Sequence, residues 1–262
     1  MNEFVVEFPS IRFCNEASRF NDNIIKEERV TFFLNNKKLI STMSLPNDQD
    51  AQAVGFLMSE GVIESIDNIK NITISSDGLK VYIDAFINED NINNLYHEKT
   101  LTSGCCVGVS ANFEGKIVER FISSKASYTI DKLSKFIKKF EESSELFSLT
   151  GCVHKVMLFC DDIVFSSEDI GRHNALDKAI GKARLNRVDI SDSVLIVSGR
   201  LSMEMVIKCA MHNIPIVISK SATTALGIKS ASKLGITLIG FARNNAMNIY
   251  THPSRILDIN GL

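Results

Sequence analysis

A regular alternation of short apolar segments with longer amphipathic ones, from about residue 153 onward, limits the possible folds of this chain more than any other feature. The apolar segments have the length of buried strands, and the amphipathic ones repeat their apolar residues at helical spacing. Predicted strands cover residues 153–159, 163–165, 193–197, 214–219 and 236–241, and predicted helices cover 174–183, 202–212 and 223–234. Strands that alternate with helices predict an α/β domain with a mixed, largely parallel sheet and right-handed crossovers.

The first half of the chain follows a different pattern, that of an α+β unit. Two hairpins are predicted where apolar segments flank turn residues, one around Asn35-Asn36 and one around residues 76–78. Their predicted strands are residues 29–34, 38–43, 69–75 and 79–86. A helix is expected to begin near Asp48 and to end near Ser59.

The rest of this half leads into the α/β part. The asparagine-rich stretch 88–99 is expected to form a loop or a short helix, and a helix is expected near 131–140. The change of pattern falls between about residues 115 and 148. We therefore predict a smaller α+β domain over residues 1–125 and an α/β domain over residues 126–262.

The composition is that of an ordinary globular protein. The 262 residues are 45% hydrophobic and 23% charged, and 29 Lys and Arg against 31 Asp and Glu give a formal net charge of −2. A charge so near zero provides no basic field over the whole protein, so we expect no nucleic-acid partner. No apolar run approaches the roughly 18 residues that span a bilayer, and no signal peptide is evident. We expect a cytoplasmic protein without a membrane partner.

The six cysteines are expected to be free thiols, because the cytosol is reducing. They are Cys14, Cys105, Cys106, Cys152, Cys160 and Cys209. Cys160 and Cys209 lie in apolar patterns and are predicted to be small core residues. The chain has no Cys-x-x-Cys and no paired Cys/His spacing, so we expect no metal bound by protein ligands.

Ligands of open α/β sheets collect beyond the carboxyl ends of the strands, and three such ends carry polar loops here. Each loop carries one cation, and two of them lead into helix starts whose free N–H groups favour anions. The candidate residues are Ser198, Gly199, Arg200, Lys220, Ser221, Phe241, Ala242, Arg243, Asn244 and Asn245. The alternative is that the Ser and Thr residues only cap helices. Three convergent loops favour a phosphorylated ligand.

Residues 168–174, reading EDIGRHN, place several ionisable side chains directly before a predicted helix. One interpretation makes Arg172 and His173 donors that face a ligand, with the two acids orienting them. The other is a capped helix with a solvated charge cluster. Spacing alone does not decide between them.

Adjacent thiols at Cys105 and Cys106 lie in a small loop flanked by glycines. Such a loop favours accessible thiols, and a thiolate there would be nucleophilic in a cationic setting. A pair of buried small residues in a turn and a vicinal disulfide switch are the alternatives. Cys152 and His154 would share a face if both lay on one strand, although a core cysteine beside a hydrogen-bonded histidine is the simpler interpretation.

Several separated segments together resemble the formate dehydrogenase accessory sulfurtransferase family (FdhD/NarQ). In chain order they are residues 53–65 (AVGFLMSEGVIES), 147–154 (FSLTGCVH), 166–181 (SSEDIGRHNALDKAIG), 198–208 (SGRLSMEMVIK), 235–243 (GITLIGFAR) and 250–255 (YTHPSR). The resemblance runs from about residue 24 to residue 258, in the family's order.

The resemblance implies a cytidine-deaminase-like α/β domain and a role in sulfur transfer. Members take sulfur from a cysteine desulfurase, carry it as a cysteine persulfide, and pass it to the bis-molybdopterin guanine dinucleotide form of the molybdenum cofactor. This makes formate dehydrogenase active, so the apoenzyme is an expected partner, as is a second copy of the chain in a homodimer. A guanine nucleotide is expected to mimic the cofactor.

Carried over position by position, the resemblance assigns the persulfide to Cys105, which follows Thr102-Ser103. It assigns cofactor binding to residues 241–246, which adds Ala246 to the candidates above. Many members have Cys-x-x-Cys in the sulfur loop, whereas the thiols here are adjacent, so the part played by Cys106 is open. We expect the sulfur to reach molybdenum held near Arg172, His173 and the arginines of the strand ends.

Two other functions are considered. A zinc nucleoside deaminase needs His-x-Glu and Pro-Cys-x-x-Cys around a zinc-activated water, and this sequence has neither. A non-catalytic chaperone would hold the cofactor with the same strand-end residues and deliver it to the apoenzyme without using a cysteine. Sulfur on Cys105 distinguishes a carrier from a chaperone.

Overall fold

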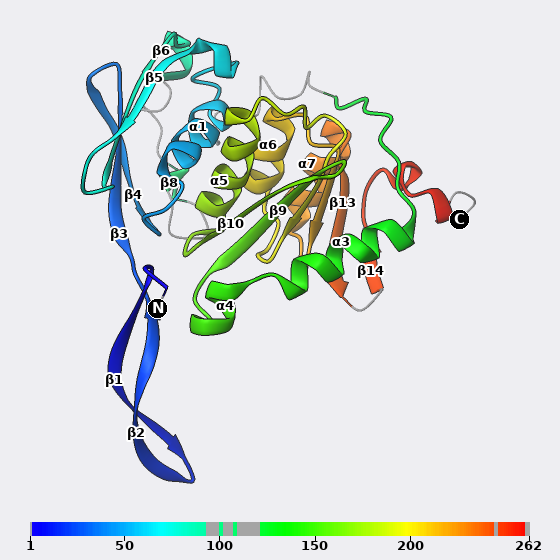
Figure 1. The fold of residues 1–262 in the computed structure, drawn as a ribbon. Helices are drawn as coiled ribbons and strands as arrows, with labels where there is room; N and C mark the ends of the chain where they lie inside the picture. The colour runs from blue at the N-terminus through cyan, green and yellow to red at the C-terminus, as the bar shows by residue number, and fades with distance from the viewer. Residues whose placement is uncertain (1, 93–99, 102–106, 109–120, 244–245, 260–262) are drawn as a thin grey trace.

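The structure is a computed structural model that describes residues 2–92, 100–101, 107–108, 121–243 and 246–259. It consists of a projecting β-hairpin arm, a four-stranded sheet with a helix against it, and a six-stranded sheet between two layers of helices (Figure 1). The candidate thiols Cys105 and Cys106, together with Asn244 and Asn245, lie outside the described residues.

The six-stranded sheet has the order β10-β9-β11-β12-β13-β14. Its strands are β9 (His154–Cys160), β10 (Ile163–Asp169), β11 (Val194–Val197), β12 (Ile216–Ser219), β13 (Thr237–Arg243) and β14 (Ala246–Ile249). The predicted mixed sheet is confirmed, but it is not largely parallel, because two of its five strand pairings are parallel and three are antiparallel. Parallel pairing joins the three central strands β11, β12 and β13, while β9, β10 and β14 pair antiparallel.

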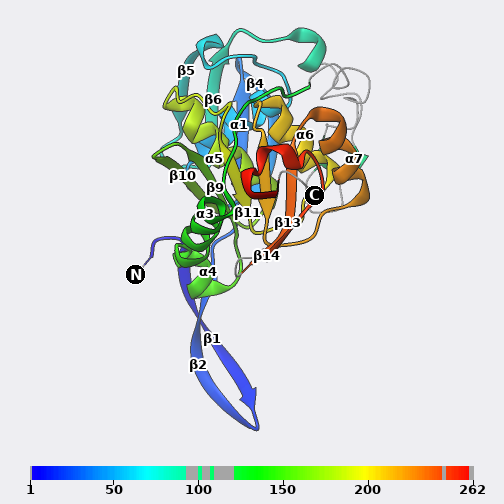
Figure 2. The same cartoon turned by 90° about the vertical axis from the view of Figure 1, so that its right-hand side faces the viewer.

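Alternation along the strands explains why helices cover both faces of this sheet. In β9, Val156 and Leu158 face one core, whereas Met157 and Phe159 face the other. One face is covered by α5 (Arg172–Leu185), α6 (Met203–Met211) and α7 (Ala225–Leu234). The other is covered by α3 (Ile130–Glu142) and by the C-terminal turns η4 (Pro253–Arg255) and η5 (Leu257–Ile259), as Figure 2 shows from the side.

The N-terminal sheet has the order β4-β3-β6-β5 and confirms both predicted hairpins. Its strands are β3 (Glu28–Leu34), β4 (Lys37–Ser44), β5 (Ile69–Ile74) and β6 (Lys80–Ala85). Asn35 and Asn36 have positive φ angles of 47° and 64°, as a two-residue turn between right-twisted strands requires. The predicted helix is α1 (Gln49–Ser59), and η1 (Ile66–Asn68) leads into β5. Short strands β7 (Thr100–Leu101) and β8 (Val107–Gly108) pair with each other.

Two glycines allow α1 to pack directly on α5. A Cβ on Gly55 would lie 2.0 Å from the carbonyl oxygen of Asp177, and one on Gly181 would lie 1.8 Å from that of Ala51. Backbone meets backbone at both points, so neither helix could carry a side chain there. The α1 helix therefore has the N-terminal sheet on one side and the helical layer of the large sheet on the other (Figure 1).

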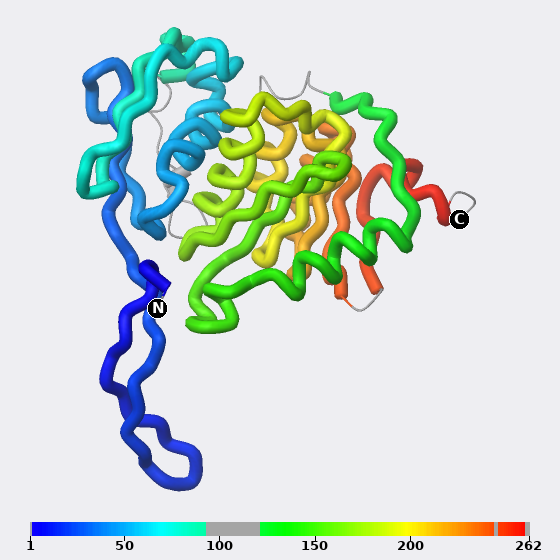
Figure 3. The backbone as a smooth tube through the Cα atoms, in the orientation of Figure 1, coloured from blue at the N-terminus to red at the C-terminus, as the bar shows by residue number. Residues whose placement is uncertain are grey.

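The arm consists of β1 (Val5–Cys14) and β2 (Glu16–Ile25), paired along their whole length. Figure 3 shows it leaving the body of the protein, with only its base near the rest of the chain. At that base Val5 and Ile25 pack with Leu146 of α4 (Glu145–Thr150). No sequence pattern predicted these two strands.

Two of the predicted bounds are wrong. Glu168 and Asp169 are the last residues of β10 and do not belong to a loop before α5, which begins at Arg172. The predicted strand 236–241 ends too early, because Ala242 and Arg243 also belong to β13 and not to a loop after it. The predicted domain boundary at residue 125 stays a prediction. Among the described residues, no helix is long and apolar enough to cross a membrane.

Candidate functional site

The carboxyl ends of β11, β12 and β13 form a rim along one edge of the six-stranded sheet. We use "rim" for residues 198–202, 219–224 and 241–243. Hydrogen bonds join its segments, because Ser219 Oγ donates to the Gly199 oxygen at 2.7 Å and Leu201 pairs with Thr223. The segments that the sequence predicted to converge are therefore in contact, in the same order as their strands.

Phe241 has an unusual backbone on this rim. Its φ is 52°, a left-handed conformation that is uncommon for a bulky residue, and its side chain is 46% exposed. The pairing of β13 with β14 is irregular here, between Gly240 and Arg243, and the Phe241 N–H donates to the Ser221 oxygen at 3.0 Å. Strain of this kind is retained mainly at functional sites, so the exposed ring is a candidate ligand contact.

Three residues predicted as cations lie on the rim, and the side chain of one of them, Arg243, contacts the backbone of another, Lys220. The guanidinium of Arg243 donates to the Lys220 oxygen from Nε and Nη2, at 3.1 and 3.0 Å. Lys220 Nζ pairs with Glu141 of α3 at 2.9 Å. Arg200 is exposed in the segment between β11 and α6. The rim therefore provides a cationic edge suited to phosphate.

A second set of polar side chains gathers where α5 and α6 begin, next to residues 198–202. His173 Nε2 and Glu204 Oε2 lie 3.6 Å apart, and His154 Nδ1 lies 3.3 Å from Ser198 Oγ. Gly199 makes room for this group, since a Cβ there would lie 3.2 Å from His154 Nδ1 and 3.4 Å from Arg172 Cβ. We call the side chains of His154, Arg172, His173, Ser202 and Glu204 the helix-start cluster.

Four buried atoms of the helix-start cluster lack a hydrogen-bond partner among the described residues: Arg172 Nε, His173 Nε2, Ser202 Oγ and Glu204 Oε2. The helix ends are open as well, because neither Gly171 nor Ser202 caps its helix through a side chain. Buried polar groups in folded proteins are almost always paired with protein, water or ligand. The cluster therefore offers unpaired donors and acceptors together.

Burial and neighbouring cations keep the imidazoles of the cluster neutral. Burial lowers the pKa of His173 to about 3, helped by the positive charges of Lys208 and Arg172. Burial also lowers the pKa of His154, again with Arg172 contributing. Burial raises the pKa of Glu204, while Arg172 and Lys208 act against it. His173 therefore carries no charge at neutral pH and can accept a hydrogen bond.

One of the two acids of the 168–174 segment, Asp169, neither orients Arg172 and His173 toward a ligand nor lies in solvent. Asp169 is fully buried, and its carboxylate accepts hydrogen bonds from Lys178 Nζ at 2.6 Å, Ser44 Oγ at 2.7 Å and the Leu45 N–H at 3.0 Å. Both interpretations are therefore wrong for Asp169, which fixes the start of α5 to the end of β4, while Glu168 is partly buried and accepts a hydrogen bond from Ser144.

A second buried ion pair behind the helix-start cluster was missed in the sequence. Lys208 Nζ donates to both oxygens of Asp177, at 2.8 and 2.7 Å, and Ser59 Oγ donates to the same carboxylate at 3.1 Å. Glu60 lies 3.8 Å from the ammonium. Ion pairs between α5 and α6 at this depth leave no periodic signal in a sequence, because they are specified only by tertiary packing.

The capping alternative for the strand-end residues is correct at one position. Thr224 caps α7 by accepting the Gly227 N–H at 3.0 Å, whereas Ser202 makes no such bond at α6. Cys160 and Cys209 are buried, as predicted, and Cys152 is exposed. Because β9 begins at His154, Cys152 lies before the strand and the proposed shared strand face with His154 does not exist.

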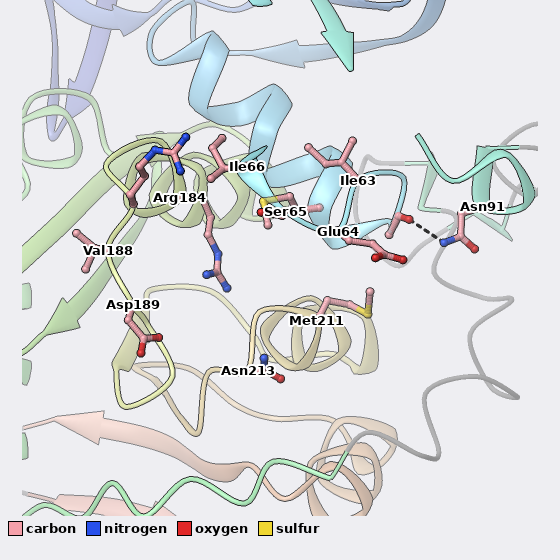
Figure 4. Close-up of a pocket in the computed structure, with 13 residues that line it drawn as sticks. Ile63, Glu64, Ser65, Ile66, Asn91, Arg184, Val188, Asp189, Met211 and Asn213 are labelled. Carbon is pink, nitrogen blue, oxygen red and sulfur yellow. Dashed lines mark hydrogen bonds between the residues drawn. The ribbon is translucent and has the colours of Figure 1, made fainter. Parts of the chain in front are cut away.

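A cavity of about 500 Å³ lies at the opposite ends of the same helices. Figure 4 shows its lining, which includes Arg184 at the end of α5, Met211 at the end of α6 and Glu64 after α1. Asn91 Nδ2 donates to the Gly61 oxygen at 2.7 Å at one side of it. It shares no residue with the rim or with the helix-start cluster, and no sequence pattern predicted it.

Comparisons with known proteins decide the family. The sequence model described as the FdhD/NarQ family matches residues 25–257. The chain belongs to the FdhD/NarQ family. The predicted resemblance over residues 24–258 is thereby confirmed, and the match includes both the rim and the helix-start cluster.

Named relatives in this family are similar over most of their length. A protein of Wolinella succinogenes called sulfur carrier protein FdhD is 58% identical over 236 residues, which are 90% of this chain and 82% of that protein. One of Bacillus subtilis with the same name is 35% identical over 245 residues, or 92% and 93%. A crystal structure from Desulfotalea psychrophila, described as a formate dehydrogenase accessory protein, matches with a TM-score of 0.82 and 26% identity, over 97% of this chain and all of that one.

Proposed function

We propose that this FdhD/NarQ protein is a cytoplasmic sulfur carrier that serves formate dehydrogenase. It takes sulfur from a cysteine desulfurase as a persulfide on Cys105 and delivers it to the molybdenum of bis-molybdopterin guanine dinucleotide. The observation that supports this most is the similarity to relatives named sulfur carrier protein FdhD, at 58% and 35% identity over at least 90% of this chain.

The loading step is a thiol exchange at sulfur. The Cys105 thiolate attacks the outer sulfur of the desulfurase persulfide, the sulfur–sulfur bond of that persulfide breaks, and the desulfurase cysteine leaves as a thiolate. A new sulfur–sulfur bond forms on Cys105, which then carries the terminal S–H. The exchange involves no net oxidation or reduction, so no oxidant is needed. The assignment of Cys105 rests on its place in the family motif.

The rim supports the proposal that the ligand is a phosphorylated dinucleotide. Arg200 and Arg243 supply positive charge for phosphates, whereas the charge of Lys220 is paired with Glu141. The exposed ring of Phe241 supplies a flat apolar surface on which a purine or pterin can stack. The helix-start cluster, which lies next to the rim, has unpaired donors and an unpaired carboxylate oxygen. This combination suits heterocycles that carry both N–H and C=O groups on one edge.

Mass spectrometry tests the carrier role. After incubation with a cysteine desulfurase and cysteine, we expect the peptide that contains Cys105 to gain about 32 Da, one sulfur atom, and to lose it on reduction. A Cys105→Ser protein is expected to stay unmodified and a Cys152→Ser protein to load normally, which makes Cys152, an exposed thiol, the matched control. Cys106→Ser decides whether the second thiol of the loop is needed.

The outcome separates the carrier from a cofactor chaperone. If Cys105→Ser still supports sulfuration of the cofactor and no sulfur appears on the wild-type peptide, the chain acts as a chaperone that holds and delivers the dinucleotide. Sulfur on another cysteine would keep the carrier role and move it to that residue.

Binding of GDP tests the rim separately. Arg243→Met is expected to weaken GDP binding by roughly 10- to 100-fold, because a charge-assisted hydrogen bond to phosphate contributes about 1.5–3 kcal/mol. Arg187→Met is the control, since its guanidinium pairs with Asp67 on the surface, away from the rim. If the wild type, Arg243→Met and Arg187→Met bind GDP with equal affinity, the rim is not part of the proposed site. Calorimetric titration is a suitable measurement.

A further inference from the structure

The helix-start cluster concentrates most of the unsatisfied hydrogen bonding in the part of the chain that the structure describes. Apart from Glu60 Oε2, every buried side-chain atom without a hydrogen-bond partner there belongs to the cluster. His173 is only 7% exposed, yet its Nε2 has no partner. Arg172, Ser202 and Glu204 are partly exposed, so a molecule from solvent can reach them. A ligand that pairs these atoms would recover the free energy that their burial costs.

The members of the cluster do not satisfy one another. His173 Nε2 and Glu204 Oε2 are 3.6 Å apart, which is longer than a hydrogen bond between nitrogen and oxygen. The ion pair behind the cluster is different, because Asp177 accepts two hydrogen bonds from Lys208 and one from Ser59. Buried charge in this region is thus paired within the protein where no ligand is needed. The gap in the cluster therefore indicates a place for another molecule.

The unpaired atoms define a pattern of donors and acceptors. A Glu204 carboxylate only accepts hydrogen bonds, and Arg172 Nε only donates one. Glu204 lies in the first turn of α6, where the helix dipole favours a negative charge. The positive charges of Arg172 and Lys208 also lower the pKa of Glu204, against the effect of burial. A fitting ligand needs N–H donors for the carboxylate and an acceptor for the guanidinium.

We infer that Glu204 recognises the 2-amino-4-oxopyrimidine edge of a heterocycle and so selects the base of the ligand. The carboxylate accepts the ring N–H and one hydrogen of the 2-amino group, and Arg172 Nε donates to the ring carbonyl. Guanine and pterin both carry this edge, and both occur in the proposed dinucleotide, so the inference rests on the proposed function. Ser202 belongs to the rim as well as to the cluster, and Arg200 is two residues before it. One nucleotide can therefore reach both with its base and its phosphates.

Calorimetric titration with three nucleotides tests the selection of the base. GDP has the whole edge, inosine diphosphate lacks the amino group, and xanthosine diphosphate has an oxo group in its place. We expect the wild type to bind GDP roughly 10- to 100-fold more tightly than inosine diphosphate, because a hydrogen bond to a charged acceptor is lost. Xanthosine diphosphate is expected to bind more weakly still, since its oxo group and the carboxylate are both acceptors.

Glu204→Gln is expected to reverse this preference. Its amide oxygen still accepts the ring N–H, and its amide N–H donates to the 2-oxo group of xanthosine diphosphate. The variant should therefore bind xanthosine diphosphate more tightly than GDP. General loss of structure would weaken all nucleotides together and could not produce this reversal. Glu64→Gln, at an exposed carboxylate beside the cavity at the other ends of the helices, is the control and is expected to bind like the wild type.

Arg172→Met gives a second pattern that does not depend on the folding of Glu204→Gln. GDP and inosine diphosphate share the ring carbonyl, so both are expected to lose roughly tenfold in affinity while their ratio stays as in the wild type. A change in the ratio would instead assign the contact with the amino group to Arg172 and overturn the role of Glu204.

Neopterin distinguishes the two sources of the edge, because it has the pterin ring and neither guanine nor phosphate. A GDP preference that depends on Glu204, without neopterin binding, identifies guanine as the ring that is recognised. Neopterin binding that Glu204→Gln abolishes, with nucleotide binding unchanged, identifies pterin. The inference is overturned if Glu204→Gln keeps the wild-type affinities for neopterin and the three nucleotides, or weakens all of them by one common factor.

Sulfur loading of the same proteins separates this inference from the carrier role. Loading of Cys105 by the desulfurase does not use the cluster, so Glu204→Gln is expected to gain about 32 Da like the wild type. Normal loading with unchanged base preference would refute the role of Glu204 and leave the carrier. Reversed base preference in Glu204→Gln, with no sulfur on the wild type, would refute the carrier and leave the recognition of the base.

Discussion

Lys178 and Lys182 lie one turn apart on α5 and have different environments. Lys178 is fully buried and donates to Asp169 at 2.6 Å and to the Leu45 oxygen at 2.8 Å. Lys182 is 28% exposed in its side chain and pairs with Asp48 at 2.7 Å. The two ion pairs have almost the same length, but only the first would leave a buried charge without its counterion if its lysine were removed.

Replacing these lysines separates the two cases. Lys178→Met is expected to lower the free energy of unfolding by about 3–5 kcal/mol, because Asp169 then keeps a buried charge without its counterion. Lys182→Met is expected to cost about 0–1 kcal/mol, as a partly exposed pair does. Urea unfolding followed by circular dichroism measures both. A cost for Lys178→Met no larger than for Lys182→Met would show that the buried pair contributes no special stability.

His173 gives the protein a pH dependence whose sign follows from its pKa. The folded-state pKa is about 3, and that of an unfolded histidine is about 6.5. Between these values the unfolded chain binds a proton that the folded protein does not. Stability therefore falls as the pH is lowered from 6.5 toward 3, by at most about 1.4 kcal/mol per pH unit from this residue.

The His173→Gln protein isolates this contribution. Because a glutamine does not titrate, we expect the variant to lose less stability than the wild type between pH 7 and pH 5, by up to about 2 kcal/mol. Urea midpoints at the two pH values give the difference, and using the difference removes the effect of other titrating groups such as Glu60. Parallel losses in both proteins would mean that His173 is protonated in the folded state.

At the scale of elements, the crossing of α1 and α5 is closer than side chains permit. Gly181→Ala is expected to destabilise the fold by about 1–3 kcal/mol, because its Cβ would lie 1.8 Å from a carbonyl oxygen of α1. Helix propensity alone predicts the opposite sign, a gain of about 1 kcal/mol. Ser232→Ala, at an exposed position of α7, is the control for a small change within a helix. Thermal unfolding that shows a stabilised Gly181→Ala protein would contradict the close crossing.

The elements themselves were largely predictable, and the reason lies in local periodicity. The Asn35-Asn36 turn, the α1 helix and the alternation from β9 to β13 are all written in short-range patterns. The continuation of β13 beyond Phe241 to Arg243 was not predictable, because an irregular pairing with β14 and a left-handed Phe depend on distant residues. The rim was predicted because parallel strands place their ends together, whatever their exact bounds.

Burial of charge was the part of the candidate site that the sequence did not reveal. Asp169, Asp177 and Lys178 look like a solvated run, yet all three are at most 3% exposed. Their partners, Ser44, Leu45 and Lys208, are 31 or more residues away in the chain. Glu204 and Ser202 were missed as site residues for the same reason, since only the packing of α5 beside α6 brings them to His173.

At the scale of the whole molecule, two cores meet at α1 and α5. A further core on the far face of the large sheet contains Phe159 and Ile137. The two cores that meet are the N-terminal core, which contains Phe32 and Leu57, and the core between α5 and the large sheet, which contains Leu176 and Leu195. Between them lie the glycine crossing and the ion pair Asp169–Lys178, which is completed by residues of β4. Separating the N-terminal sheet and α1 from α5 and the large sheet would therefore expose buried charges as well as apolar surface. This disfavours unfolding of either part without the other.

Unfolding of the full chain tests this coupling. The chain has no tryptophan, so Phe56→Trp on α1 and Phe136→Trp on α3 each provide a single fluorescent reporter. Phe56 is partly buried beside the N-terminal core, and Phe136 is partly buried beside the core on the far face of the large sheet. If the cores unfold together, the fluorescence midpoint in urea of each variant coincides with its own midpoint from far-ultraviolet circular dichroism. A reporter on α1 that responds at lower urea than the circular dichroism would show that the N-terminal part unfolds first, and the α1–α5 contact would then be too weak to couple the N-terminal part to the helix-start cluster.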